Sequence, residues 1–184
     1  MDELKELKKR LSQERPTSWE GLPDIPLYMD QIISYMPRQL VGFGDGERLT
    51  PAMVNNYIKD GLLPRADGKK YNRTHLSYLT AICALKQVLS VKEIKALLGA
   101  REKDAQALYA DFTAALDSAM GQTAAGLDDT VEREELSRLA LVLALRSYAD
   151  KLACQRILDL LRPEEQGEAK KESAKHTKNR REET

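Results

Sequence analysis

The chain has 184 residues, with 29 Lys and Arg against 29 Asp and Glu, so its formal net charge is zero. This length allows one domain with an attached helical element or two small domains, and the 5% aromatic content predicts a core of aliphatic side chains. The chain has no run of eighteen apolar residues and no apolar signal segment at its start, so we expect a cytoplasmic protein without a membrane span.

Residues 1–26 are expected to form a helix followed by an apolar strap. Leu4, Leu7 and Leu11 have the spacing of one helix face, and they predict a short amphipathic helix that ends before the next proline. The apolar segment after it contains Trp19, which indicates an extended strap that packs on the rest of the protein.

Residues 27–99 are expected to form the central domain, which begins with a helix over residues 27–36. The glycines of residues 37–49 predict a loop after that helix. Two later helices are predicted over residues 73–89, with His75 at an exposed start, and over residues 90–98. The second of these opens with a capping box, in which the side chains of Ser90 and Glu93 satisfy each other's backbone N–H groups.

Between them, a helix over residues 51–60 has clear start and stop signals. Thr50 is a good N-cap because its hydroxyl can accept a backbone N–H, and the proline after it suits the first helical position. Gly61 suits the left-handed residue that closes a helix. Asn55 and Asn56 lie mid-helix although asparagine is a poor helix former. Their amides indicate contact with base edges or phosphates, and the alternative is two surface residues without a partner.

A short basic loop over residues 64–71 follows this helix. Asp67-Gly68 is a common hairpin turn, so the loop is predicted to be a small β-hairpin wing with two strands of two or three residues. Arg65, Lys69 and Lys70 could hold the phosphate backbone beside a groove, or they could belong to an ordinary solvated loop.

Residues 100–162 are expected to form a C-terminal helical dimerisation element. Apolar residues at spacings of three and four predict a helix over residues 103–120, and the small residues 123–127 predict a link.

The longest helix is predicted over residues 131–161, and it begins at a capping box of Asp129 and Glu132. Residues 139–145 are apolar on every side of this helix. One neighbouring helix cannot cover such a surface, so we expect a second subunit there. The polar and charged residues 163–184 predict a disordered tail.

The charges are unevenly distributed along the chain. Residues 48–75 contain six Lys and Arg against two Asp, whereas residues 101–135 contain three Lys and Arg against nine Asp and Glu. Phosphate binding needs only a local basic patch, so the zero net charge is compatible with a nucleic-acid partner. A patch of this size also occurs on solvated loops that bind nothing.

The segment from Leu49 to Leu98 resembles the DNA-binding domain of MerR-type regulators. The features that match occur in the family's order: Tyr57 in the helix, then Gly61-Leu62-Leu63-Pro64, Tyr71, and Ser90-Val-Lys-Glu-Ile94. The resemblance implies a winged helix-turn-helix with helix 51–60 in the major groove and the wing on the backbone.

The recognition helix departs from the MerR pattern. MerR-type helices carry arginines where this chain has Ala52 and Asn55, and a tyrosine where it has Asn56, which weakens phosphate anchoring. From Trp19 to about Leu161 the chain also resembles a family of small bacterial proteins known as domain of unknown function 1836, a resemblance that implies no activity.

These observations predict a mainly α-helical, dimeric regulator that binds duplex DNA. The residues expected to contact DNA are Thr50, Ala52, Met53, Asn55, Asn56, Tyr57, Lys59, Arg65, Lys69, Lys70, Tyr71 and Arg73. The resemblance implies a phosphate contact for Tyr57, with a core ring as the alternative, and Tyr71 is also suited to packing at the base of the wing.

Other functions remain open. A protein-interaction module on the same scaffold, without DNA binding, is favoured by the few arginines, and a ligand-sensing regulator would need an apolar pocket between the C-terminal helices. No nucleophile neighbours a base, so no enzyme is predicted. Cys83 and Cys154 lie far apart in apolar stretches, so we expect reduced, buried thiols, with no metal and no cofactor.

Overall fold

The computed structural model describes residues 2–40, 48–99 and 104–161 of the protein. These residues are mainly helical, as expected. The seven α-helices of the described residues are α1 (Asp2–Gln13), α2 (Met29–Tyr35), α3 (Pro51–Lys59), α4 (Arg73–Leu85), α5 (Val91–Gly99), α6 (Ala105–Gly126) and α7 (Leu136–Leu161), with 3₁₀ turns η1 (Met36–Arg38) and η2 (Arg133–Glu135). None of these helices combines the length and apolar character that crossing a membrane requires.

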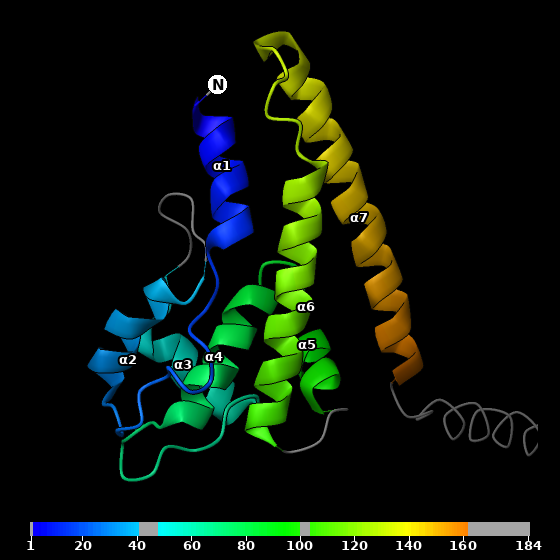
Figure 1. Ribbon diagram of the computed structural model, residues 1–184. Helices are drawn as coiled ribbons and strands as arrows, with labels where there is room; N and C mark the ends of the chain where they lie inside the picture. The colour runs from blue at the N-terminus through cyan, green and yellow to red at the C-terminus, as the bar shows by residue number, and fades with distance from the viewer. Residues whose placement is uncertain (1, 41–47, 100–103, 162–184) are drawn as a thin grey trace, which may run out of the picture.

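The helices form a body and a projecting lobe. In the body, α2 to α5 surround an aliphatic core whose fully enclosed side chains include Ile32, Val54, Leu79, Ile82 and Ile94. α6 runs from the body into the lobe, where α1 lies on one side of it and α7 on the other (Figure 1). α1 and α4 pack against α6, and α7 packs against α5. The lobe therefore consists of α1, the C-terminal half of α6 and the N-terminal half of α7.

The limits of α3 follow from its two ends. Thr50 accepts a hydrogen bond of 3.3 Å on its Oγ1 from the backbone N–H of Met53, as an N-cap should. At the other end Gly61 has a φ of +72°, and the N–H of Leu62 donates to the carbonyl of Tyr57 at 2.8 Å. This hydrogen-bond pattern is a Schellman motif, which satisfies carbonyls that the last turn would leave free. Both predicted signals are confirmed.

The basic loop, residues 64–71, contains a tight turn one residue later than predicted. Asp67 and Lys70 form an isolated antiparallel bridge, and the residues between them, Gly68 and Lys69, have φ values of 52° and 70°. Two successive positive φ values correspond to a type I′ turn. The described residues contain isolated bridges and no strands of two or three residues, so that part of the wing prediction is wrong.

The strap, residues 17–26, leads into a backbone pairing with this loop. Leu27 and Tyr71 exchange two backbone hydrogen bonds of 2.7 and 2.8 Å, which joins the end of the strap to the end of the basic loop. Leu22 is buried in the core, and the Trp19 ring lies 6.3 Å from the ring of Tyr109 on α6. The strap is therefore packed on the body as expected.

The other helices of the body differ slightly from the prediction. The helix expected over residues 27–36 begins later, at Met29, and η1 continues it through Pro37, since proline is tolerated in a first turn. α4 ends at Leu85, four residues early, and turns follow it to Leu89. The capping box at the start of α5 is confirmed: Ser90 N–H donates to the Glu93 carboxylate at 2.7 Å.

α6 is longer than predicted. The helix continues through Gly121 to Gly126, so the predicted link at residues 123–127 is wrong. Thr123 donates its hydroxyl to the carbonyl of Ala119, which lies one turn earlier. Gly121 costs only about 1 kcal/mol relative to alanine, and the neighbouring alanines are the strongest helix formers.

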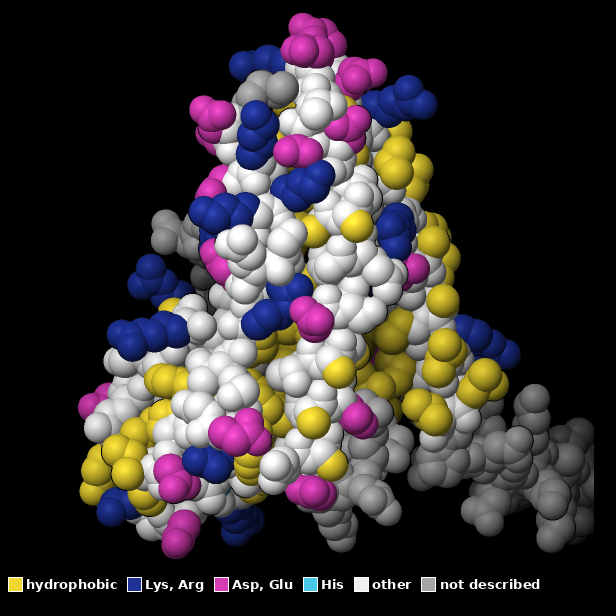
Figure 2. Space-filling model, viewed as in Figure 1, with side chains coloured by type: hydrophobic (Ala, Val, Ile, Leu, Met, Phe, Trp, Pro, Cys, Tyr) yellow, Lys and Arg dark blue, Asp and Glu magenta, His cyan; other side chains and the backbone are white. Residues whose placement is uncertain are grey.

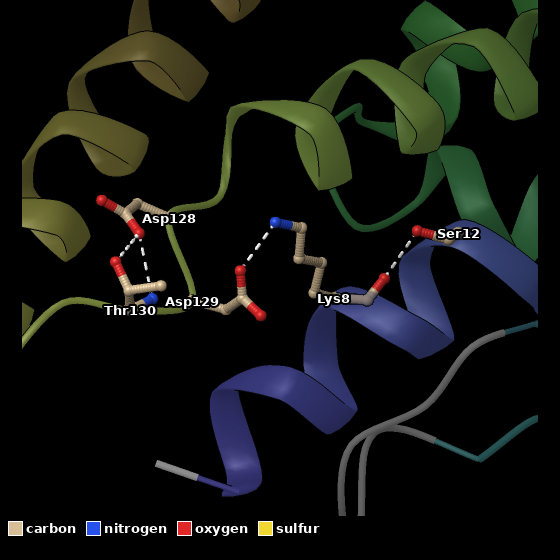
Figure 3. Close-up of polar contacts among 5 residues, drawn as sticks. All are labelled: Lys8, Ser12, Asp128, Asp129 and Thr130. Atoms are coloured by element: carbon tan, nitrogen blue, oxygen red, sulfur yellow. Dashed lines mark hydrogen bonds and ion pairs between the residues drawn. The ribbon is translucent and has the colours of Figure 1, made fainter.

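The predicted capping box at the start of α7 is also wrong. Asp129 instead forms an ion pair of 2.8 Å with Lys8 on α1, and Asp128 accepts two hydrogen bonds from Thr130 (Figure 3). Both carboxylates are therefore occupied in the turn before α7, and neither caps a helix. α7 begins only at Leu136, after η2. The ion pair fixes α1, which has no buried residue, to the connection between α6 and α7.

A candidate nucleic-acid interface

α3 exposes one polar stripe, which we call the α3 stripe: Ala52, Asn55, Asn56 and Lys59. These positions are three, four and seven residues apart, so they lie along one face of the helix. Val54 and Tyr57 point to the opposite side and are buried in the core. These buried side chains fix the orientation of α3 about its own axis. In this orientation the amides of Asn55 and Asn56 and the ammonium group of Lys59 face solvent.

The basic loop, which follows α3 in the chain, carries three exposed cations, Arg65, Lys69 and Lys70. The Nζ of Lys70 lies 5.6 Å from the centre of the Tyr28 ring, close enough for a cation–π contact. Lys69 occupies the left-handed second position of the turn. The turn thus carries two consecutive exposed lysines, one of which contacts Tyr28.

Two tyrosines that were predicted to contact DNA have buried rings. Tyr57 is only 3% exposed and its hydroxyl is enclosed, so it cannot reach a phosphate outside the protein, and Tyr71 is only 5% exposed. The Tyr71 ring packs edge-on against His75 with 5.3 Å between the ring centres. Burial also raises the pKa of Tyr71. The core alternative for Tyr57 and the packing role of Tyr71 replace the predicted contacts.

Arg73 was also predicted to contact DNA, and it binds the strap instead. Its Nη2 donates to the carbonyl oxygen of Leu22 at 3.3 Å and lies 3.2 Å from the carboxylate of Asp24. Its guanidinium carbon lies 5.7 Å from the centre of the Trp19 ring. A cation held by three partners of the strap is not free to bind a phosphate.

Two further predicted contacts have structural roles. Thr50 uses its hydroxyl as the N-cap of α3, and Met53 is half-buried and packs against the core. The candidate surface therefore consists of the α3 stripe and the three cations of the basic loop.

His75 is buried, contrary to the expectation that it lies at the surface. Its Nδ1 lies 3.1 Å from the backbone N of Asn72, and its Nε2 lies 3.3 Å from the carbonyl oxygen of Arg65. Burial lowers the pKa of His75, against the opposing effect of the backbone carbonyl groups. The histidine therefore ties the start of α4 to the basic loop and favours its neutral form.

Sequence patterns gave no indication of two exposed apolar residues beside the loop, Ile25 and Tyr28. The bridge between Leu27 and Tyr71 brings them there. This pairing joins segments more than forty residues apart, so no local pattern could reveal it. Lys95 on α5 also lies near α3 and donates to the carbonyl of Asp60 at 2.8 Å.

The described residues hold no group of three His, Cys, Asp or Glu that could bind a metal ion. Cys83 and Cys154 form no disulfide, and both are only half-buried. A groove of about 410 Å³ lies between the strap and α6, with Trp19 and Tyr109 in its lining and the ion-paired Arg15 and Asp117 at its edge. This groove does not lie between the C-terminal helices, where a ligand-sensing regulator was expected to have its pocket.

The fold and this surface define a mainly α-helical protein with a polar and basic surface on a short helix and the loop after it. The family model described as a domain of unknown function (DUF1836) matches residues 17–113, and the chain belongs to this family. The match contains the strap and α2 to α5 and ends inside α6, well before Leu161. Comparisons with curated proteins and with solved structures gave no match.

Proposed function

We propose that this protein is a transcriptional regulator that binds duplex DNA as a dimer. In this proposal α3 enters the major groove and the basic loop contacts the phosphate backbone, in the manner of a MerR-like winged domain. The observation that carries the proposal is the α3 stripe: both asparagines and Lys59 face solvent on one side of a helix whose other side is fixed by the core.

The chemistry of the stripe suits a DNA groove. An asparagine amide can donate to N7 and accept from N6 of adenine, and a major groove about 12 Å wide admits one α-helix. The small side chain of Ala52 lets the backbone approach the bases. The cations of the basic loop can bind phosphates, which fixes the position of the helix without reading sequence.

The proposal is tested by mobility shifts with the full-length protein after selection from random duplexes. Changing Asn55 and Asn56 together to alanine is expected to abolish the preference for the selected sequence while non-specific binding remains. Changing Lys69 and Lys70 to alanine is expected to weaken binding to all sequences. It should also reduce the slope of log affinity against log salt by about two units.

A matched control is the pair Lys5 and Lys9, which are exposed on α1. Changing both to alanine removes the same charge and should leave the affinity and the salt slope nearly unchanged. Equal effects of the two double variants, or a selection that yields no preferred duplex, would refute the proposal.

A protein-interaction module without DNA binding is the second candidate. The observation in its favour is charge: once Arg73 is assigned to the strap, the exposed cations of α3 and the basic loop are accompanied by two exposed carboxylates, Asp60 and Asp67. In that case the asparagine variant would lose a protein partner in co-purification and would show no change with any duplex.

A further inference from the structure

α7 exposes an apolar stripe that its own body does not cover. Leu141, Leu145, Tyr148 and Leu152 are 58%, 58%, 61% and 49% exposed. Their spacings of four, three and four residues place them along one face, over roughly 17 Å of helix. We call this set the α7 stripe. Figure 2 shows hydrophobic side chains gathered along this helix.

The opposite face of α7 holds the contacts to the body. Leu158 is 1% exposed, and Cys154 and Gln155 near it are half-buried. Leu139 and Leu143 are half-buried as well, on the same side of the helix. Because the body fixes this inner face, the α7 stripe points outward. Soluble monomers rarely leave a contiguous apolar stripe of this size uncovered.

The composition of residues 163–184 does not suit a cover for the stripe. Residues 163–184 contain no Leu, Ile, Val, Met, Phe, Tyr or Trp. Their side chains are mostly charged or polar, so folding them back on α7 would bury almost no additional apolar surface. An occupant with a complementary apolar face is therefore to be sought in another molecule.

We propose that a second copy of this chain covers the stripe, with its α7 antiparallel to the first. In this arrangement Leu141 packs on Leu152 of the second copy, and Leu145 packs on its Tyr148. Each copy contributes the same four side chains, so the two-fold pairing forms four apolar layers and closes the interface. This proposal specifies the dimer that the proposed function assumes, and it does not depend on DNA binding.

The spacing of the α7 stripe suits the antiparallel direction. The intervals of four, three and four residues between Leu141, Leu145, Tyr148 and Leu152 are the same in both directions along the helix. Antiparallel pairing therefore places every side chain of the stripe opposite one of the second copy.

Sedimentation equilibrium of the full-length protein at micromolar concentration tests the interface. The wild type is expected to be a dimer, and Leu145→Glu is expected to be a monomer with an unchanged helical circular dichroism spectrum. Ala153→Glu is the control, since Ala153 is exposed on α7 but lies away from the stripe, and this variant should remain dimeric. A monomeric wild type, or a dimeric Leu145→Glu protein, overturns the proposal.

Disulfide exchange tests the direction of the helices. Chains with Leu141→Cys and chains with Leu152→Cys, both with the two natural cysteines changed to alanine, are mixed and oxidised. An antiparallel pair predicts that the mixed disulfide exceeds both homodisulfides. A predominance of homodisulfides would show parallel helices and overturn the proposal.

The dimer and DNA binding fail separately in these experiments. The Asn55 and Asn56 double variant should remain a dimer in sedimentation, because the α3 stripe is not part of α7. Dimeric wild-type protein that selects no duplex would remove the proposed function alone. Binding of monomeric wild-type protein to phosphatidylglycerol vesicles would assign the α7 stripe to a lipid surface and overturn the dimer.

Discussion

Gln155 on α7 donates a hydrogen bond of 2.9 Å from its Nε2 to Oε1 of Glu93 on α5. The other carboxylate oxygen of Glu93 accepts from the backbone N–H and from the hydroxyl of Ser90, both at 2.7 Å. A single carboxylate thus closes the first turn of α5 and attaches α7 to the body. Because Lys95 on the same helix donates to the carbonyl of Asp60, α5 connects α7 with the end of α3.

Gln155→Ala is expected to raise the pKa of Glu93. The backbone N–H of Ser90 contributes most to holding that pKa at about 2, and the Ser90 hydroxyl and Gln155 lower it further. A carboxylate with a depressed pKa stabilises the fold above its ordinary pKa, and this contribution is lost as the pH falls from about 4.5 towards 2. Carbon NMR titration of the Glu93 carboxyl measures the shift.

The control is Gln122→Ala, because Gln122 donates to the hydroxyl of Ser118 on α6. This variant should leave the Glu93 titration unchanged. An identical Glu93 pKa in wild type and Gln155→Ala would show that the contact between α5 and α7 is not formed in solution.

The stability of the protein is expected to fall when the pH is lowered below about 6.5, because His75 is buried in its neutral form. A histidine with a lowered pKa binds its proton more readily in the unfolded chain, so acid favours unfolding. The slope for one proton is at most about 1.4 kcal/mol per pH unit. Urea unfolding at pH 7.5 and pH 5.5 measures the difference.

His75→Gln should remove most of this difference, since glutamine does not titrate. His176→Gln serves as the control and should retain the wild-type pH dependence. Equal slopes in the wild type and His75→Gln would assign the acid sensitivity to other groups.

Gly61→Ala is expected to destabilise the protein by about 1–2 kcal/mol, because an L-residue is strained at a φ of +72°. An added Cβ would meet only Lys95 Nζ, at 3.6 Å, so the cost comes from the backbone and not from a clash. Gly121→Ala is the matched substitution inside α6, where the space is open. It should stabilise the protein by about 0.5–1 kcal/mol. Thermal unfolding gives both values.

Lys69→Gly is expected to separate two effects of this residue: that of its backbone strain on stability and that of its charge on DNA binding. Glycine removes the strain of a φ of 70° and should stabilise the protein by about 1 kcal/mol. It also removes one ammonium group, so binding to duplex DNA should weaken. Lys70→Gly removes the same charge at an ordinary φ and should not stabilise the protein. A stabilised Lys69→Gly variant with full DNA affinity would exclude Lys69 from the proposed contact.

The helices of the body were predictable because their ends depend on neighbouring residues. Thr50, Gly61 and the Ser90–Glu93 pair act within one turn of the backbone, so their sequence signals coincide with the observed caps. The start of α7 was mispredicted for the opposite reason. Asp129 looks like a local cap, but its carboxylate binds Lys8, more than one hundred residues away.

The candidate surface was predictable to the same extent. The α3 stripe follows from helical periodicity and from the apolar side chains on the other face of α3. The positions of Tyr71 and Arg73 depend on the strap, which pairs with one and binds the other. Because those contacts link distant segments, the sequence left both a DNA contact and packing open for Tyr71, and it suggested a DNA contact for Arg73 where the fold has a contact with the strap.

α6 extends beyond the family match and connects the body with the lobe. The family match ends at residue 113, yet the helix continues unbroken to Gly126, and α7 returns from the far end to α5. A fragment cut at residue 113 would end in the middle of a helix and would lose the side chains of α7 that cover α5. Because α6 is unbroken between the lobe and the body, a displacement of the lobe would also move the part of α6 that packs on α4.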